Sequence, residues 1–277
     1  MSKGKRKSDN KTEKNSKNKI VRIIILIVLL GVLAFSGYKL INYLIAGNKT
    51  NQIVETLSQS VAVDESLEDT STEKYQIDWE SLIAQNDETV GFIRVYGTSV
   101  EHVVVQAKDN DYYIDHDFEC NHNPAGWIFA DYRNQFDGND KNIILYGHNM
   151  LNGTMFSSLK EILTRDWQEE PRNRYVVFNT PEENAIYEVF SVYQIEDEAY
   201  YITTNFIYDD FGAFVNKLKS RSFYNFGTEV GEDDSILTLS TCAYDKRYRI
   251  VLHAKKLITE DTLEEIEDFI QESIVND

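Results

Sequence analysis

An uncharged apolar run near the amino terminus is the strongest hydrophobic signal in the chain. Residues 23–38 read IIILIVLLGVLAFSGY, and after Lys39 the run continues as LINYLIAG up to Gly47. Broken only by Lys39, it reaches about 25 residues, enough at roughly 1.5 Å per helical residue to cross a bilayer core. The pattern predicts an uncleaved transmembrane helix at residues 20–46. The competing interpretation is a cleaved signal peptide, whose apolar region would be shorter and followed by a small-residue cleavage site that is not evident.

A polar segment separates this run from the rest of the chain. Residues 47–74 are rich in Ser, Thr and acidic residues and show only weak helical periodicity, which predicts a stalk or a short helix. The next residues, 75–86, read YQIDWESLIAQN and place Trp79 and Leu82 at helical spacing behind Asp78. Because Asp is a favoured N-cap, a short helix is expected to begin there.

From Val90 onward the pattern changes to short apolar runs with turns between them. β-Branched and aromatic residues dominate the runs, and Gly, Asn and Asp separate them, as is typical of strands. About eight strands at this spacing predict a mainly β fold, a closed or nearly closed eight-stranded β-barrel. The candidate strands are residues 91–97, 99–106, 126–131, 141–148, 175–180, 185–195, 235–242 and 248–257.

Helical periodicity interrupts or follows the strands at three places. A short amphipathic segment covers residues 155–162, and a clearer one covers residues 209–221, with Phe211, Val215 and Leu218 among the apolar residues of one face. These are expected to be helical insertions in the barrel domain, residues 75–258. Residues 259–277 contain TEDTLEEIEDFIQESI and predict a final acidic helix.

Charge is distributed unevenly along the chain. The net charge is -18, yet nine Lys and Arg residues lie at or before Arg22, against Asp9 and Glu13. The positive-inside rule therefore predicts a cytoplasmic tail at residues 1–19 and places residues from about 48 onward outside the cell. The acidic remainder would repel phosphates, which argues against nucleic-acid binding. No close cluster of His, Cys and acidic ligands is apparent, so neither a metal nor another cofactor is expected.

Two cysteines are present, and only one has chemically suggestive neighbours. Cys120 is expected to be a small buried hydrophobe. In the strand ending at Cys242, alternation places Ser240 and Cys242 on one face. If this strand and the next pair as a hairpin, Cys242 and Arg249 oppose each other with Cβ atoms about 5 Å apart. Arg247 has the same parity and remains an alternative to Arg249.

A cation at this position would favour the reactive thiolate and could donate hydrogen bonds to an oxyanion. The same spacing is equally compatible with an exposed hairpin whose Cys is merely small and whose Arg is merely solvated. A thiol nucleophile also requires an acid/base. His148 follows IILYG at a strand end, where its side chain can project from a rim, but a lone His is usually an ordinary surface or core residue. The other histidines are His102, His116, His122 and His253.

The motifs at these positions resemble those of a known family. TLSTC followed by RIVLHAK is similar to the TLxTC signature and downstream arginine strand of sortases, and YGHN fits their histidine motif. GTMFSSL soon after the histidine, together with a long helix between late strands, resembles class B sortases. The resemblance covers roughly residues 75–257. It implies Cys242 as nucleophile, His148 as acid/base and Arg249 as oxyanion-stabilising or substrate-positioning group.

The resemblance also implies a binding groove and a reaction. Ser240, Tyr201, Ile202 and Asn110 would line the groove for a sorting signal. A membrane-anchored sortase, its catalytic domain outside a Gram-positive cell, would cleave a surface protein at a Thr–X bond through a Cys thioester. The acyl group would then pass to an amine of a peptidoglycan precursor (lipid II or a cross-bridge) or of a pilin.

Two other functions remain open at this point. An L,D-transpeptidase is also an extracellular Cys/His acyl-transfer enzyme, but it would carry glycine just before the cysteine, where this chain has Thr241. A non-catalytic wall-associated binding module would use the barrel as a scaffold and leave Cys242 unreactive.

Overall fold

The computed structural model describes residues 5–63, 75–150, 152–196, 198–206, 210–242 and 248–257, with the backbone alone for residues 5–20 and Cys242. The chain divides into two compact units, Met1–Ile45 and Ala46–Asp277. The predicted acidic helix at 259–277 and Arg247 lie outside the described residues.

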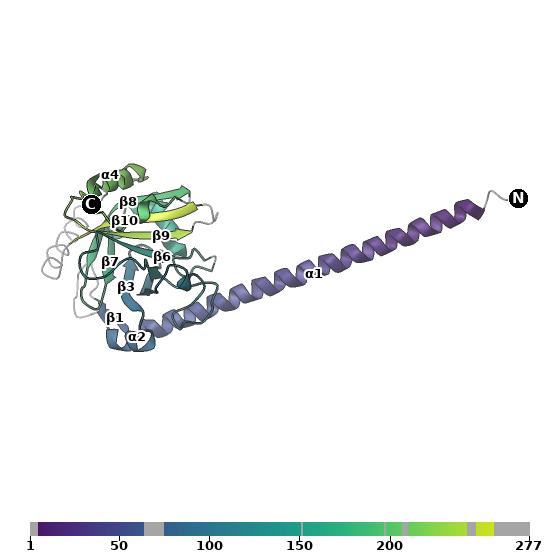
Figure 1. Cartoon of the computed structure of the whole chain (residues 1–277), viewed down its shortest axis with the longest axis horizontal. Coiled ribbons are helices and arrows are strands. Elements are labelled where there is room, and N and C mark those ends of the chain that lie inside the picture. Colours follow the sequence, from purple (N-terminus) through teal and green to yellow (C-terminus); the bar gives the residue numbers. More distant parts are fainter. Residues whose placement is uncertain are drawn as a thin grey trace. The chain divides into compact units, whose positions relative to one another are not determined.

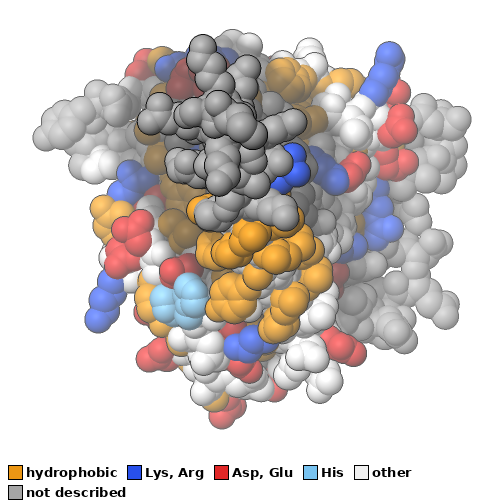
Figure 2. Space-filling view, turned by 90° about the vertical axis from the view of Figure 1, so that its right-hand side faces the viewer, with side chains coloured by type: hydrophobic (Ala, Val, Ile, Leu, Met, Phe, Trp, Pro, Cys, Tyr) orange, Lys and Arg blue, Asp and Glu red, His pale blue; other side chains and the backbone are white. Residues whose placement is uncertain are grey.

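The first unit consists of the greater part of helix α1 (Lys5–Ser58). Most of its apolar side chains from Val21 to Ile45 are exposed, and Figure 2, which looks along the helix, shows hydrophobic side chains gathered in one patch. Among the described residues, the segment Val21–Ser58 has the length and apolar composition to cross a membrane. This agrees with the apolar run that the sequence shows.

A closed barrel of eight strands forms the centre of the second unit, as predicted (Figure 1). The order around the barrel is β10-β8-β7-β3-β4-β5-β6-β9, in which the pairs β4–β5 and β6–β9 are parallel and the others antiparallel. Each strand falls on one of the eight runs expected from the sequence. The strands are β3 (Thr89–Val95), β4 (Glu101–Val105), β5 (Phe129–Ala130), β6 (Asn142–Gly147), β7 (Tyr175–Asn179), β8 (Ile186–Glu196), β9 (Ile236–Cys242) and β10 (Tyr248–Lys256).

Helices lie at the three places between residues 75 and 258 where the sequence predicts them, and further short helices lie elsewhere. Asp78 accepts a hydrogen bond from the Ser81 amide at 3.0 Å and so caps α2 (Trp79–Gln85). Asp210 caps α4 (Phe211–Arg221) in the same way, through the Ala213 amide at 2.9 Å. The remaining short helices are η1 (Tyr112–Ile114), η2 (Ser157–Leu163), α3 (Arg165–Glu169), η3 (Pro171–Arg174) and η4 (Tyr200–Ile202).

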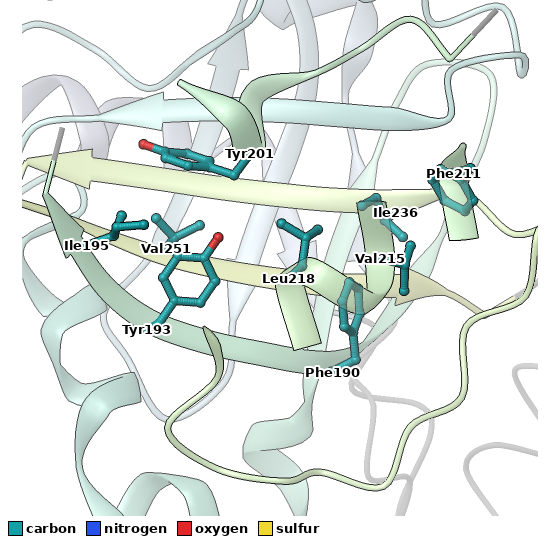
Figure 3. Packing of buried hydrophobic residues seen from close by; sticks show 9 residues of the cluster. All are labelled: Phe190, Tyr193, Ile195, Tyr201, Phe211, Val215, Leu218, Ile236 and Val251. Carbon is teal, nitrogen blue, oxygen red and sulfur yellow. The ribbon is translucent and has the colours of Figure 1, made fainter. Parts of the chain in front are cut away.

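A buried apolar layer lies between α4 and the strands β8, β9 and β10 (Figure 3). Leu218 and Val215 of α4 pack there with Phe190 of β8 and Val251 of β10. Tyr201 of η4 belongs to the same cluster. The layer therefore fixes η4, and with it one wall of the pocket described below, to the outer face of β9 and β10.

The last turns of α1 belong to the second unit and pack against it. Ala46, Thr50, Ile53 and Leu57 are buried at helical spacing. Lys49 pairs with the buried carboxylate of Asp117 at 2.7 Å. The segment expected to be a stalk or a short helix thus contains the end of helix α1, followed by strand β1 (Val61–Val63), which pairs with β2 (Tyr75–Ile77).

The prediction for Cys120 is wrong, because this side chain is exposed. The residue lies in a tight turn, in which its amide donates to the Asp117 carbonyl at 2.9 Å and its φ is 61°. Turn backbone lies at protein surfaces, so the turn brings this residue to the surface although the residue type usually lies in cores.

Candidate active site

Three adjacent strands bring the predicted catalytic residues together. In the hairpin, Arg249 of β10 pairs with Cys242 of β9, the register that strand parity predicts. On the other side of β9, β6 runs parallel and pairs Gly147 with Thr241. The next position on each of these strands is His148 and Cys242. The backbone therefore places His148, Cys242 and Arg249 side by side at one rim of the barrel, where β6 and β9 end and β10 begins. We call this rim the open edge.

His148 is half-buried and has a fixed orientation. Its Nε2 lies 2.8 Å from the carbonyl oxygen of Ile114 in η1. Since a carbonyl oxygen can only accept, Nε2 carries the hydrogen of this bond and Nδ1 is the nitrogen left for proton exchange. Gly147, just before His148, lets the ring of Phe156 pack directly against the backbone, because a Cβ at that position would lie 2.8 Å from the ring.

The segment that supplies the Ile114 carbonyl is held by a second glycine. Gly126 has a φ of 58°, a conformation that favours glycine. An added side chain there would collide with the backbone oxygens of Tyr113 and Ile114. The amide of Trp127 also donates to the Tyr113 carbonyl at 3.0 Å. These contacts fix the position of the oxygen that orients His148.

Arg249 supplies a permanent positive charge at the same edge. Its side chain is half-buried, lines the pocket and donates from Nη1 to the carbonyl of Tyr248 at 3.2 Å. A guanidinium keeps its charge at any physiological pH, which suits it to a developing oxyanion. The thiol of Cys242 and all of Arg247 lie outside the described part, so the strand register alone relates Cys242 to its neighbours.

A cavity of about 310 Å³ opens beside these residues. Six side chains singled out in the sequence line it, and they come from five separate segments. Tyr201 of η4 hydrogen-bonds to Ser240 of β9 at 2.9 Å, which joins two of the predicted groove residues. The six are His148, Arg249, Ser240, Tyr201, Ile202 and Asn110.

Other lining residues were not predicted from the sequence. Tyr146 lies two residues before His148 on β6, so strand alternation could have placed it on the same face. Ile114, in the short helix η1, and Trp127 also line the cavity; Trp127 falls in the run 126–131 predicted as a strand, but it lies ahead of β5, so strand alternation does not give its direction. Their apolar surfaces give the cavity a largely hydrophobic wall, as is usual for ligand pockets.

A buried carboxylate lies behind this wall. Asp131 accepts hydrogen bonds from Tyr146 and Asn110, each at 2.9 Å, and from Arg133 at 2.7 Å. Burial alone would raise the pKa of Asp131, but the hydrogen bonds from Arg133, Tyr146 and Asn110 outweigh it and hold the pKa below its usual value. Burial, reinforced by the charge of Asp131, raises the pKa of Tyr146.

The other histidines are used differently. His253 is fully buried on β10, with Nε2 2.8 Å from the hydroxyl of Tyr193 and Nδ1 2.9 Å from that of Thr238. Burial lowers the pKa of His253 to about 3 and that of His102 to about 4. His116 and His122 form an isolated bridge in the loop after η1. None of these four lines the cavity.

Comparisons with known proteins show the family to which this chain belongs. The family model for the sortase domain matches residues 93–257. Sortase B of Listeria monocytogenes is 35% identical over 231 residues, which cover 82% of this chain and 92% of that protein. Sortase B of Staphylococcus aureus is 32% identical over 230 residues, covering the same shares of the two chains.

Solved structures show the same relation in three dimensions. The crystal structure of sortase B from Bacillus anthracis in complex with AAEK1 is 33% identical, with a TM-score of 0.67, and the match covers 78% of this chain and 100% of that one. The Staphylococcus aureus sortase B–substrate complex is 32% identical, with the same TM-score and coverage. These findings decide between the alternatives that the sequence left open. The chain belongs to the sortase family, in its class B, and is a cysteine transpeptidase.

Proposed function

We propose that this sortase is a single-pass membrane protein that attaches surface proteins to the cell wall of a Gram-positive cell. The exposed apolar surface of α1 supports a membrane anchor (Figure 2). The basic residues before it support a cytoplasmic amino terminus. In this arrangement residues 47–74 connect the anchor to an extracellular catalytic domain at 75–258.

The proposed reaction is two-step acyl transfer at a Thr–X peptide bond. The thiolate of Cys242 attacks the threonine carbonyl carbon, and the oxygen becomes an oxyanion beside Arg249. The C–N bond then breaks as His148 gives the proton on Nδ1 to the departing nitrogen. This leaves a thioester on Cys242, a neutral His148 and a released peptide with a new amino terminus.

The second step reverses these roles. An amine of the peptidoglycan precursor, or of a pilin, attacks the thioester carbonyl, and Nδ1 of His148 takes the proton that the amine loses. Cys242 leaves as the thiolate, so that the enzyme returns to its starting state. The Ile114 carbonyl supports both steps, because it holds Nε2–H of His148 throughout and keeps Nδ1 directed to the reaction.

We infer that the cavity holds part of the sorting signal. Apolar surfaces of Ile202 and Trp127 suit aliphatic parts of the signal, whereas Asn110 and Ser240 offer polar groups to its backbone. The class B resemblance favours an Asn-Pro-x-Thr-like signal on the surface protein.

The observation that carries the proposal is the placement of His148, Cys242 and Arg249 on three neighbouring strands beside this cavity. Its test is to incubate the full chain in detergent with a library of peptides of the form Asn-Pro-x-Thr-x and an amine acceptor. Product masses should show cleavage after threonine and attachment of the amine there. Cleavage at another bond, or none with any peptide, would refute the proposed specificity.

A further inference from the structure

We propose that Asp131, which does not itself line the cavity, is the positioning residue that sets the shape of its signal-binding wall. One buried carboxylate connects three lining residues, Asn110, Tyr146 and Ile202, that come from three different segments of the chain. This inference rests on the proposed function, because it concerns how the same cavity holds its peptide.

Two of the lining residues bond to the carboxylate directly. The Tyr146 hydroxyl and Nδ2 of Asn110 each donate to Oδ2 of Asp131 at 2.9 Å. The other amide atom of Asn110, Oδ1, accepts from the backbone N–H of Tyr132 at 3.0 Å. The amide group of Asn110 is therefore held at both ends, which fixes the side of it that faces the cavity.

The third lining residue is reached through Arg133. Its Nε and Nη2 each donate to Asp131 at 2.7 Å, one to each carboxylate oxygen. Nη2 also donates to the backbone oxygen of Ile202 in η4 at 2.9 Å. The bidentate pair orients the guanidinium, so that the position of η4 depends on the carboxylate although Asp131 does not touch it.

The charge of Asp131, and not its shape alone, is needed for this arrangement. Its side chain is fully buried and receives five hydrogen bonds, the fifth from the backbone N–H of Arg133 at 3.0 Å. A carboxylate can only accept, and all five partners donate. In Asp131→Asn, an NH₂ group replaces one of the two oxygens. It must face either the backbone N–H and Nε of Arg133, which donate to Oδ1, or the donors to Oδ2, which are Asn110, Tyr146 and Nη2 of Arg133. Either orientation sets donor against donor.

The test compares Asp131→Asn with a matched control in the full chain. Asp117 is the control, because its side chain is equally buried and pairs with Lys49 at 2.7 Å, away from the cavity wall. We expect Asp131→Asn to raise KM for an Asn-Pro-x-Thr-x peptide about tenfold, while kcat stays within about threefold. The rate at which iodoacetamide alkylates Cys242 should stay the same, since none of the hydrogen bonds of Asp131 goes to His148 or Arg249. Asp117→Asn should leave KM unchanged.

A double-variant cycle separates positioning from general loss of structure. If Asp131 acts through Tyr146, then Asp131→Asn combined with Tyr146→Phe should raise KM by less than the product of the single effects. An unchanged KM in Asp131→Asn, an equal rise in Asp117→Asn, or multiplicative effects in the double variant would overturn the proposal.

A second measurement needs no substrate. Amide hydrogen exchange should become at least about tenfold faster at Tyr132 and in residues 200–203 of Asp131→Asn, because their links to the carboxylate are broken. The same amides should exchange normally in Asp117→Asn. Unchanged exchange in Asp131→Asn would refute the positioning role even if no tested peptide is cleaved, whereas faster exchange without cleavage would refute only the proposed peptide specificity.

Discussion

His148 and His253 lie in two regions of the same barrel, and they show how burial decides what a histidine side chain does. His148 follows β6 at the open edge, where one ring nitrogen is held by Ile114 and the other is free to exchange a proton. His253 is buried against Phe190, Tyr193 and Tyr201 of the apolar layer (these three neighbours are labelled in Figure 3), and both of its ring nitrogens are hydrogen-bonded. Thr238 donates to Asn142 at 2.7 Å, so it accepts from Nδ1–H of His253 and leaves Nε2 to accept from Tyr193.

The difference lies in the environment and not in the residue type. Burial lowers the pKa of His253 to about 3, which keeps it neutral and useful only as a fixed hydrogen-bonding group. A histidine that must give and take protons needs an exposed nitrogen near the reacting atoms. The open edge should therefore control turnover, and the buried layer should control stability.

The largest effect is expected at the edge. His148→Gln keeps a donor for the Ile114 carbonyl but cannot transfer a proton, so kcat should fall by about 10²–10⁴-fold. The free energy of unfolding should change by less than about 0.5 kcal/mol, because the side chain is half-buried and makes few contacts. Peptide turnover and urea denaturation measure the two quantities. Near-normal turnover would remove His148 from the chemistry.

Arg249 should show the next largest effect. Arg249→Lys keeps the charge but loses the planar guanidinium fork, and kcat should fall by about 10²-fold, an effect typical of losing one oxyanion donor. Stopped-flow or discontinuous peptide assays can measure this change. A normal kcat in the variant would direct attention to Arg247, which has the same strand parity.

A change in the buried layer should affect stability instead. His253→Leu removes the acceptor of the Tyr193 hydroxyl and the donor to Thr238, and should lower the free energy of unfolding by about 1–3 kcal/mol. The remaining folded enzyme should turn over peptide at a near-normal rate. Thermal unfolding measures the change in stability, and peptide assays on the same samples measure the turnover rate. A large loss of kcat without a loss of stability would contradict the division between edge and layer.

The last prediction leaves turnover aside and concerns the pH dependence of stability. The pKa of His253 is about 3 in the folded chain against an ordinary value of 6.5, so the unfolded state binds the extra proton as the pH falls below 6.5. Stability should therefore be lost between about pH 6.5 and pH 3, at up to about 1.4 kcal/mol per pH unit for this group.

His102 contributes in the same direction, since its pKa is lowered to about 4. Urea denaturation at about pH 7 and about pH 5 should thus show a shallower pH dependence in His253→Leu than in the natural chain. Identical slopes would show that His253 does not carry this dependence.

Local pattern predicts much of this molecule because its strands are regular. Alternation predicts a hairpin register that pairs Cys242 with Arg249, although it leaves Arg247 as an alternative, and the eight apolar runs give the eight strands. The parallel contact of β6 with β9 could not be derived from pattern, because it joins segments about 90 residues apart. For His148, the family resemblance supplied what the pattern did not.

Irregular segments explain most of what the sequence did not reveal. The Ile114 carbonyl acts through backbone, so its side chain carries no signal of its role. The network around Asp131 depends on loops whose course follows from tertiary packing, and the same holds for the exposure of Cys120. Strand periodicity cannot predict any of these features.

The most direct test of the central claim is the intact mass of the full chain after brief reaction with an Asn-Pro-x-Thr-x peptide and no acceptor amine. We predict an added mass equal to the acyl fragment ending in threonine, located on Cys242 by peptide mapping and absent from Cys242→Ala. Cys120→Ala is the matched control and should form the adduct normally. Adduct or turnover that persists in Cys242→Ala would contradict the assignment of the nucleophile.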